Sequence, residues 1–362
     1  MNSSPHISRR PLTTLLLIPT GINAAIGGYA GDALPVARAI AAVADTLITH
    51  PNVLNGASLF WPMPNVLYVE GYAIDRLALG EWGLRPVHGN RIGVILDRAI
   101  EPDLELRHRQ AIAAAQATLG LDIGDIAISD RPLGVQLEMG SSGATWGTIA
   151  QPDSLLRAAH KLVDRAKVSA IAVVARFPDD QNSLLLKDYR QGKGVDALAG
   201  AEAVISHLIT RELAIPCAHA PALQPLPLDP DVSPRSAAEE LGYTFLPCVL
   251  AGLSRAPQLI ADRANLRSGD LSVQDIDVAI APASACGGVA ILALGQSKQT
   301  TLIFVEENPT AIKVPPESLG LHGIRVRSYL EAIGVLAALR AGVNPKSLIL
   351  ESIASNSDRK IL

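Results

Sequence analysis

The chain has 362 residues, of which 48% are hydrophobic and 18% charged, so it contains enough apolar material for a large core. Its formal net charge of -4 gives no overall attraction to nucleic acid or anionic membranes, and an aromatic content of 4% is low for a surface that stacks on bases. We therefore expect a small-molecule substrate as the partner, and neither nucleic acid nor a membrane. The sequence leaves open whether the chain forms a homo-oligomer.

The three cysteines, Cys217, Cys248 and Cys286, have no paired spacing, which is typical of proteins from a reducing compartment. The polar start of the chain is followed by an apolar run over 15–18, which is too short for a signal-peptide core. No stretch approaches the roughly 20 apolar residues that span a bilayer. These features predict a cytoplasmic protein.

The first predicted elements are a buried strand over 12–18, a polar loop over 19–32, a helix over 35–44 and a strand over 46–49. Similar cycles of apolar strand and amphipathic helix recur along the chain. The further predicted strands are 66–69, 91–96, 126–129, 170–175, 278–281 and 301–305, and the further helices include 104–119, 151–166, 200–213 and 329–341. This alternation is typical of parallel sheets that are covered by helices on both faces.

We therefore predict an α/β fold with mostly parallel, Rossmann-like sheets flanked by helices. The pattern is compatible with an N-terminal lobe over 12–150 and a C-terminal lobe over 151–362, and equally with one integrated domain. A proline-rich connector over 216–234 is predicted to be a stiff surface crossing or a lid rather than a helix.

Ligands of open parallel sheets bind beyond the carboxyl ends of the strands, so the loops that follow strands are the candidate sites. The first such loop combines glycines with short polar side chains before a helix N-terminus, which suits a phosphate or carboxylate. Its candidate binding residues are Thr20, Gly21, Asn23, Gly27, Gly28 and Asp32. The glycine spacing matches neither a Walker loop nor the dinucleotide fingerprint, and a tight turn with structural glycines is the alternative.

The second loop begins with His50, which could serve as a general base, and continues with the binding candidates Asn52 and Asn55. A satisfied core histidine is the alternative for His50. Glu70, after the next predicted strand, adds a carboxylate that we expect at the same edge of the sheet.

A hydroxyl-rich segment over 140–148 contains Ser141 and Ser142, which could bind an oxyanion or supply a nucleophile. A hairpin turn explains the same composition.

Ser284 and Cys286 lie between a predicted strand and a predicted helix. A thiol at a helix N-terminus has a lowered pKa, so Cys286 is our candidate nucleophile. The alternative is a small buried apolar residue. Glu306 follows the next strand, where acid–base chemistry or metal binding is possible.

His207, Cys217 and His219 match no zinc-site spacing, so we assign no metal ligands. His219 is a candidate for proton transfer and His207 for substrate binding. Arg176 could bind an anionic substrate, although a solvated basic residue is the commoner meaning. The sequence indicates no particular cofactor.

Four segments carry a resemblance to a known family: PTGINAAIGGYAGDALPVA (19–37), THPNVLNGA (49–57), ISHLITRELAIPCAHAPA (205–222) and APASACGGVAIL (281–292). On these segments the chain resembles an uncharacterised family known as a domain of unknown function. The resemblance covers nearly the whole chain and favours one integrated unit, and it implies no activity or catalytic residue.

Our leading hypothesis is an enzyme, a hydrolase or transferase, that acts on a small polar or anionic metabolite in a cleft of strand-end loops. Cys286 would be the nucleophile, and His50 or His219 the general base. A metabolite-binding or sensor protein without catalysis and a metal-dependent enzyme are the alternatives. All three require that these distant residues meet at one edge of a sheet.

Overall fold

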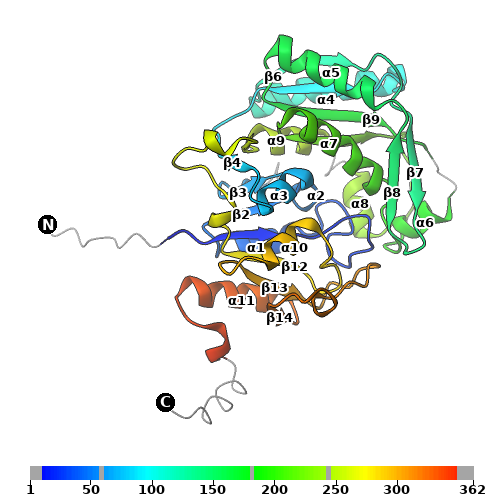
Figure 1. Cartoon of the computed structure of the whole chain (residues 1–362). Helices are drawn as coiled ribbons and strands as arrows, with labels where there is room; N and C mark the ends of the chain where they lie inside the picture. Colours follow the sequence, from blue (N-terminus) through cyan, green and yellow to red (C-terminus); the bar gives the residue numbers. More distant parts are fainter. Residues whose placement is uncertain (1–9, 57–60, 180–182, 242–245, 349–362) are drawn as a thin grey trace, which may run out of the picture.

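The structure is a computed structural model that describes residues 10–56, 61–179, 183–241 and 246–348. Within these ranges the main features are a six-stranded and a four-stranded parallel sheet, with helices packed against them (Figure 1). The predicted α/β fold is therefore confirmed.

The larger sheet has the strand order β14-β13-β12-β1-β2-β3, and all neighbouring strands are parallel. Its strands are β1 (Thr13–Leu16), β2 (Thr46–Thr49), β3 (Val66–Tyr68), β12 (Val278–Pro282), β13 (Thr301–Val305) and β14 (Ile324–Val326). Numbered within this sheet alone, the order is 3-2-1-4-5-6, which is that of doubly wound dinucleotide-binding sheets. The order reverses between β1 and β12, so a crevice opens beyond the carboxyl ends of these two strands.

Alternate residues of the central strand β1 pack on opposite faces of the larger sheet. The helices on these faces are α1 (Leu34–Ala41), α3 (Gly71–Ala78), α10 (Val289–Gly295) and α11 (Tyr329–Arg340). Leu16 packs in a core that includes α1 and α11, whereas Leu15 packs in a core that includes α3 and α10. Burial on both faces explains why Leu15 and Leu16 are consecutive apolar residues in this strand.

The smaller sheet, with the order β10-β9-β5-β6, is inserted in the chain between β3 and β12. Its strands are β5 (Ile92–Leu96), β6 (Ile123–Ile128), β9 (Ala170–Arg176) and β10 (Cys217–Ala222), and its helices are α4 (Pro102–Leu119), α5 (Pro152–Ala166), α7 (Ala199–Leu213) and α9 (Leu246–Ser254). Each sheet thus takes strands from both sides of residue 150. One core cluster contains residues of both sheets, such as Leu16 and Val94.

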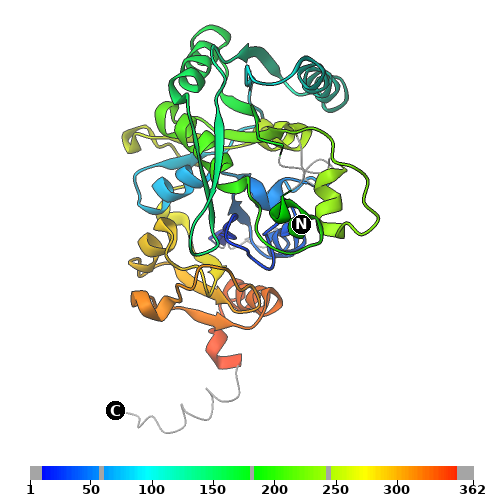
Figure 2. The same ribbon diagram turned by 90° about the vertical axis from the view of Figure 1, so that its right-hand side faces the viewer.

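Two small antiparallel pairs and several short helices complete the described chain. The pairs are β7 (Val135–Met139) with β8 (Thr145–Ile149) and β4 (Gly83–Arg85) with β11 (Gln258–Ile260), and the short helices are α2 (Pro51–Leu54), α6 (Leu184–Arg190) and α8 (Pro234–Glu240) with 3-10 turns at Arg263–Asn265, Val273–Asp275, Pro316–Leu319 and Pro345–Leu348. Figure 2 shows the molecule from the side on which β7, β8, α6 and α8 lie. No helix in the described ranges combines the length and the apolarity needed to cross a membrane.

The prediction for the connector over 216–234 was wrong in its first part, because Cys217–Ala222 forms strand β10. Pro221 lies within this strand, which is at the edge of the smaller sheet. Proline is tolerated at a sheet edge because the backbone N–H that it lacks is not required there for pairing with a further strand.

Candidate functional site

A cavity of about 1090 Å³ lies beyond the carboxyl ends of the larger sheet. Its lining includes Thr20, His50, Glu70 and Ala285, which follow β1, β2, β3 and β12, together with residues from the inserted part of the chain. The cavity therefore lies at the point where the strand order reverses, the usual ligand site of such sheets. Its volume is at the upper end of the range for small-molecule sites.

His50 is placed in the cavity by the end of β2 and is the residue that precedes helix α2. Burial lowers its pKa to about 4, against the opposing effect of its hydrogen bond to the Ile18 backbone, so the imidazole is neutral at pH 7. Its Nε2 is shielded from solvent and has no hydrogen-bond partner among the described residues. A buried nitrogen of this kind normally has a hydrogen-bond partner, so His50 Nε2 is a candidate contact for a ligand.

Glu70 caps the N-terminus of α3, where its carboxylate accepts a hydrogen bond from the Tyr72 N–H at 2.8 Å. Its Oε1 lies 2.9 Å from the His207 Nε2 and accepts a hydrogen bond from the Ser206 Oγ at 3.4 Å. Burial alone would lower the pKa of His207, but the Glu70 carboxylate outweighs burial and the pKa is raised. This cluster joins α3 of the larger sheet to α7 of the inserted part.

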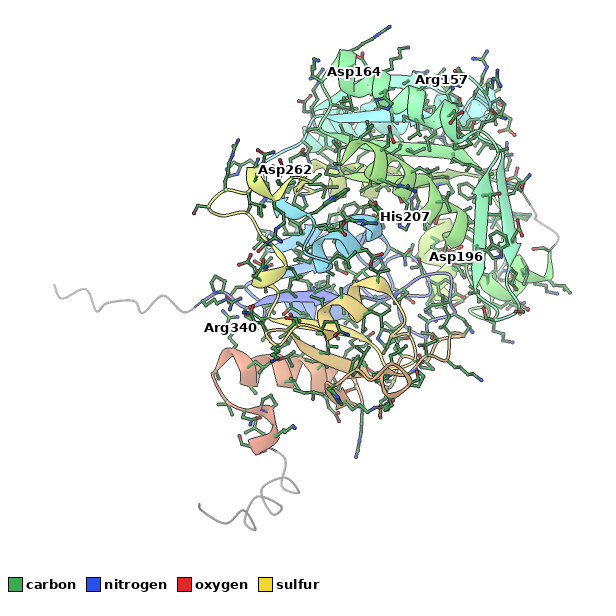
Figure 3. All side chains as sticks on the ribbon, viewed as in Figure 1. Arg157, Asp164, Asp196, His207, Asp262 and Arg340 are labelled. Carbon is green, nitrogen blue, oxygen red and sulfur yellow. The ribbon has the colours of Figure 1, made fainter. Side chains whose placement is uncertain are left out.

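A second polar cluster contains His219 of β10 and Glu202 of α7, with 3.5 Å between the His219 Nε2 and the Glu202 Oε2. Asp196 precedes α7, and its carboxylate accepts a hydrogen bond from the Leu198 N–H at 2.8 Å. Burial and the nearby Glu202 charge raise the pKa of Asp196 to about 7. Figure 3 shows Asp196 and His207 in the region between the two sheets.

Glu239 of α8 is the third carboxylate of this cluster, and it also lines the cavity. It accepts hydrogen bonds from the Tyr189 O–H at 2.9 Å and from the Ala30 N–H at 2.6 Å. Burial and the Asp196 charge raise the pKa of Glu239 to about 8. Carboxyl groups with such raised pKa values hold protons near neutral pH and are typical of acid–base sites.

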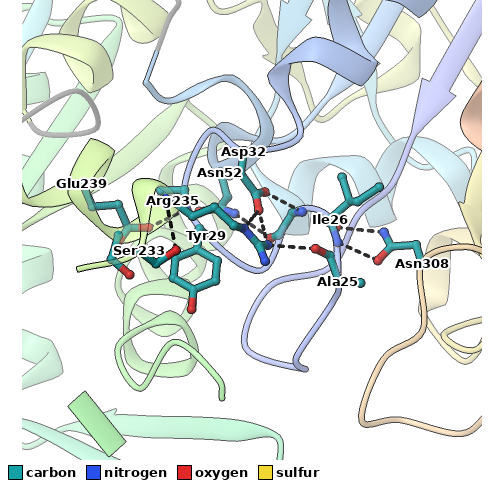
Figure 4. Close-up of polar contacts among 12 residues, drawn as sticks. Ala25, Ile26, Tyr29, Asp32, Asn52, Ser233, Arg235, Glu239 and Asn308 are labelled. Atoms are coloured by element: carbon teal, nitrogen blue, oxygen red, sulfur yellow. Dashed lines mark hydrogen bonds and ion pairs between the residues drawn. The ribbon is translucent and has the colours of Figure 1, made fainter. Parts of the chain in front are cut away.

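The glycine-rich first loop is held by polar contacts within the loop and with residues outside it (Figure 4). The Asp32 carboxylate accepts hydrogen bonds from the Gly27 N–H at 2.5 Å and from the Arg235 Nε at 2.8 Å, and the Arg235 guanidinium lies 4.2 Å from the centre of the Tyr29 ring. Gly31, at φ +77°, donates its N–H to the Asn52 carbonyl at 2.8 Å. Asp32 is thus paired with a cation already and has a structural role.

The structure brings seven of the residues suggested by the sequence into the cavity lining. They are Thr20, His50, Asn52, Asn55, Glu70, His207 and His219. The other suggested residues lie outside the lining described for this cavity, namely Gly21, Asn23, Gly27, Gly28, Asp32, Ser141, Ser142, Arg176, Ser284, Cys286 and Glu306.

Cys286 lacks the properties that made it our candidate nucleophile. Helix α10 begins at Val289, with Gly288 as its N-cap, so the thiol is not at the helix N-terminus. The residue is fully buried, and burial raises the pKa of its thiol to about 11. The alternative in the sequence, a small buried apolar residue, describes this position.

Four further candidates, Arg176, Glu306, Ser141 and Ser142, lie outside the cavity lining. Arg176 forms ion pairs with Glu101, at 2.8 Å, and with Asp179. Glu306 is half-exposed and lies 3.0 Å from Arg325. The serines of the hydroxyl-rich segment are exposed in the turn between β7 and β8, as the hairpin alternative predicted.

No pattern in the sequence pointed to Asp196, Glu202 or Glu239 as site residues. Glu202 and Glu239 lie within helices and Asp196 lies in the loop before α7, and at such positions an acidic residue is normally a solvated surface charge. Glu70 was found because it directly follows a strand. Among the described residues, no group of three or more histidine, cysteine, aspartate or glutamate side chains is arranged to hold a metal ion.

A family model described as "Protein of unknown function (DUF3326)" matches residues 13–349. The chain belongs to this family. An "Uncharacterized lipoprotein" from Synechococcus sp. (strain ATCC 27144 / PCC 6301 / SAUG 1402/1) is 59% identical to it over 339 residues, which is 94% of this chain and 94% of the relative. No solved structure matches the chain significantly.

The comparison corrects one prediction from the sequence. The relative is named a lipoprotein, and this finding contradicts the cytoplasmic location that we expected. Membership of the family agrees with the resemblance described above, and it assigns no reaction to the cavity.

Proposed function

We propose that the protein is an enzyme that carries out acid–base chemistry, by hydrolysis or group transfer, on a small polar metabolite bound in the cavity. The observation that carries this proposal is the meeting of Asp196, Glu202, Glu239 and His219 in one cavity at the reversal point of the larger sheet. Sites of this kind need a group that holds a proton and a group that accepts one at the same pH.

The two roles can be assigned to named groups. With a pKa of about 8, Glu239 holds its proton at pH 7 and can act as the general acid. The pair of Glu202 and His219 can act as the general base, since the Glu202 carboxylate lies 3.5 Å from the His219 Nε2 and can orient the imidazole. Cys286 has no part in this scheme, because its thiol is buried and has a raised pKa.

The proposal is tested by incubating the purified protein with a defined library of polar metabolites and following each compound by mass spectrometry. For a converted compound, we expect Glu202→Gln to lower kcat by about 100-fold or more, the usual contribution of a general acid or base. Glu212→Gln is the matched control, since Glu212 lies on the same helix α7 and 3.6 Å from His160, and both of these side chains are about half-exposed.

Unchanged turnover in both Glu202→Gln and Glu239→Gln, with both variants folded, would refute the acid–base assignment. Retention of a compound without any conversion would support a binding protein in its place.

A further inference from the structure

Aspartate and glutamate residues outnumber arginine residues in the lining of the cavity. Its lining contains eight aspartate and glutamate residues and two arginines, Arg107 and Arg190. Arg190 is neutralised by Glu240, at 2.8 Å, and lies 3.8 Å from Asp229, while Arg107 is exposed on α4. The interior of the cavity is therefore poor in positive charge that is free to bind an anion.

Three of the carboxylates, those of Asp196, Glu202 and Glu239, repel one another. The pKa of Asp196 is raised by the Glu202 charge, and the pKa of Glu239 by the charges of both others, in addition to burial. The hydrogen bonds described for Asp196 and Glu239 come from backbone N–H groups and from the Tyr189 hydroxyl, and none comes from a lysine or arginine. A positive group placed among the three carboxylates would relieve this repulsion.

Two histidine nitrogens in the same cavity are also without hydrogen-bond partners among the described residues. They are the Nδ1 of His219 and the Nε2 of His50, and both are shielded from solvent. The hydrogen bond from His50 to the Ile18 backbone engages its other ring nitrogen, which leaves Nε2 of the neutral ring with a lone pair. An acceptor of this kind fits an N–H donor on a ligand, independently of the carboxylates.

We propose that the ligand of this cavity is an organic cation, a small molecule whose ammonium or guanidinium group binds among Asp196, Glu202 and Glu239. The inference rests on the proposed use of the cavity as the substrate site. In the sequence, the glycine-rich loop and Arg176 suggested an anionic substrate, whereas the ligand proposed here is a cation. Arg176 is not available to bind an anion, because it is already paired with Glu101 and Asp179.

The test compares small molecules that have carbon chains of equal length and differ in charge, so that the shape of the ligand stays similar. Binding of 1,4-diaminobutane, 1,4-butanediol and succinate, and of the corresponding eight-carbon compounds, is measured by calorimetry and thermal shift on the full chain. We expect a diamine to bind about tenfold or more tightly than the matching diol, and the dicarboxylates to bind less tightly than either.

Proton release distinguishes binding at this cluster from binding elsewhere. A cation beside Asp196, whose pKa is about 7, should lower that pKa, so diamine binding at pH 7 should release protons and the measured enthalpy should depend on the ionisation enthalpy of the buffer. We expect Asp196→Asn to weaken diamine binding and to reduce this proton release. Glu212→Gln should change neither, and circular dichroism verifies that each variant is folded.

Equal binding of diamines and diols, tighter binding of a dicarboxylate, absence of diamine binding at millimolar concentration, or binding of a divalent metal ion alone would overturn the inference. A dicarboxylate that binds in the cavity would overturn the cationic ligand and leave the acid–base proposal intact. Diamine binding without turnover of any amine would support the cationic ligand and overturn the acid–base proposal.

Discussion

Replacing Asp196 with asparagine tests whether the carboxylates that line the cavity destabilise the native state electrostatically. The pKa of Asp196 rises from 3.8 to about 7 on folding, mainly through burial and the neighbouring Glu202. Each unit of difference corresponds to about 1.4 kcal/mol, so the ionised carboxylate destabilises the native state by at most about 4 kcal/mol. Because Asp196 shares this effect with neighbouring carboxylates, we expect the variant to gain about 2–4 kcal/mol of unfolding free energy at pH 8.

The pH dependence follows from the sign of the shift. Between the unfolded and folded pKa values the native protein binds a proton that the unfolded chain has released, so the contribution of Asp196 to stability falls as the pH rises from about 4 to about 7. The gain from Asp196→Asn should therefore be absent near pH 4 and complete at pH 8. Urea unfolding followed by circular dichroism at several pH values measures it. A loss of stability at pH 8 would refute the reasoning.

Asp130 is a control of opposite sign. Its hydrogen bonds to Arg157 and Ser154 hold its pKa well below the usual range, so its stabilising effect is present at neutral pH and is lost as the pH falls through the folded pKa. Asp130→Asn should therefore lower stability at pH 8 and have a smaller effect in acid. If both variants changed stability in the same direction at pH 8, general effects of removing negative charge would explain the result.

Three further substitutions or treatments test individual contacts. Glu70→Gln should lower the unfolding free energy by about 1–3 kcal/mol at pH 6 and by less at pH 9, because the raised pKa of His207 keeps this pair ionised only at the lower pH; equal losses in urea unfolding would contradict this. A thiol reagent at pH 8 should label the native chain slowly at Cys286 and at both other cysteines, which are all buried, and quickly in urea; rapid native labelling would contradict their burial. Gly31→Ala should cost about 1–3 kcal/mol in thermal or urea unfolding, because φ is +77° and a Cβ would lie 2.0 Å from the Asn55 carbonyl oxygen; unchanged stability would exclude this close contact.

The strands of the core could be predicted because burial on both faces leaves a local signature. The runs that form β9 and β12 are apolar at almost every position, and each was expected within a few residues of its observed bounds. Strand order could not be predicted, because Thr14 pairs with Val278 on a strand that follows only after the whole inserted sheet. No local periodicity in the sequence indicates such a pairing. The entropic cost of closing a loop rises only slowly with its length, so a long insertion between paired strands is tolerated.

The candidate site was predictable to the extent that its residues directly follow strands. His50 and Glu70 met this condition, because β2 and β3 are parallel neighbours whose ends lie at one edge of the sheet. Cys286 met it as well, yet its side chain packs into the core beneath α10. A strand end therefore fixes where the backbone lies, while the direction of the side chain depends on the residues that pack around it.

The inserted part of the chain explains why the site combines residues that are so distant in sequence. Glu70 contacts His207, Ala30 donates to Glu239, and Asp32 pairs with Arg235, so each contact joins a loop of the larger sheet to the inserted part. The first two contacts lie at the cavity, and the third holds the glycine-rich loop beside it. We infer that this loop positions the two parts against each other, and that the carboxylates brought by the insertion determine which ligand binds.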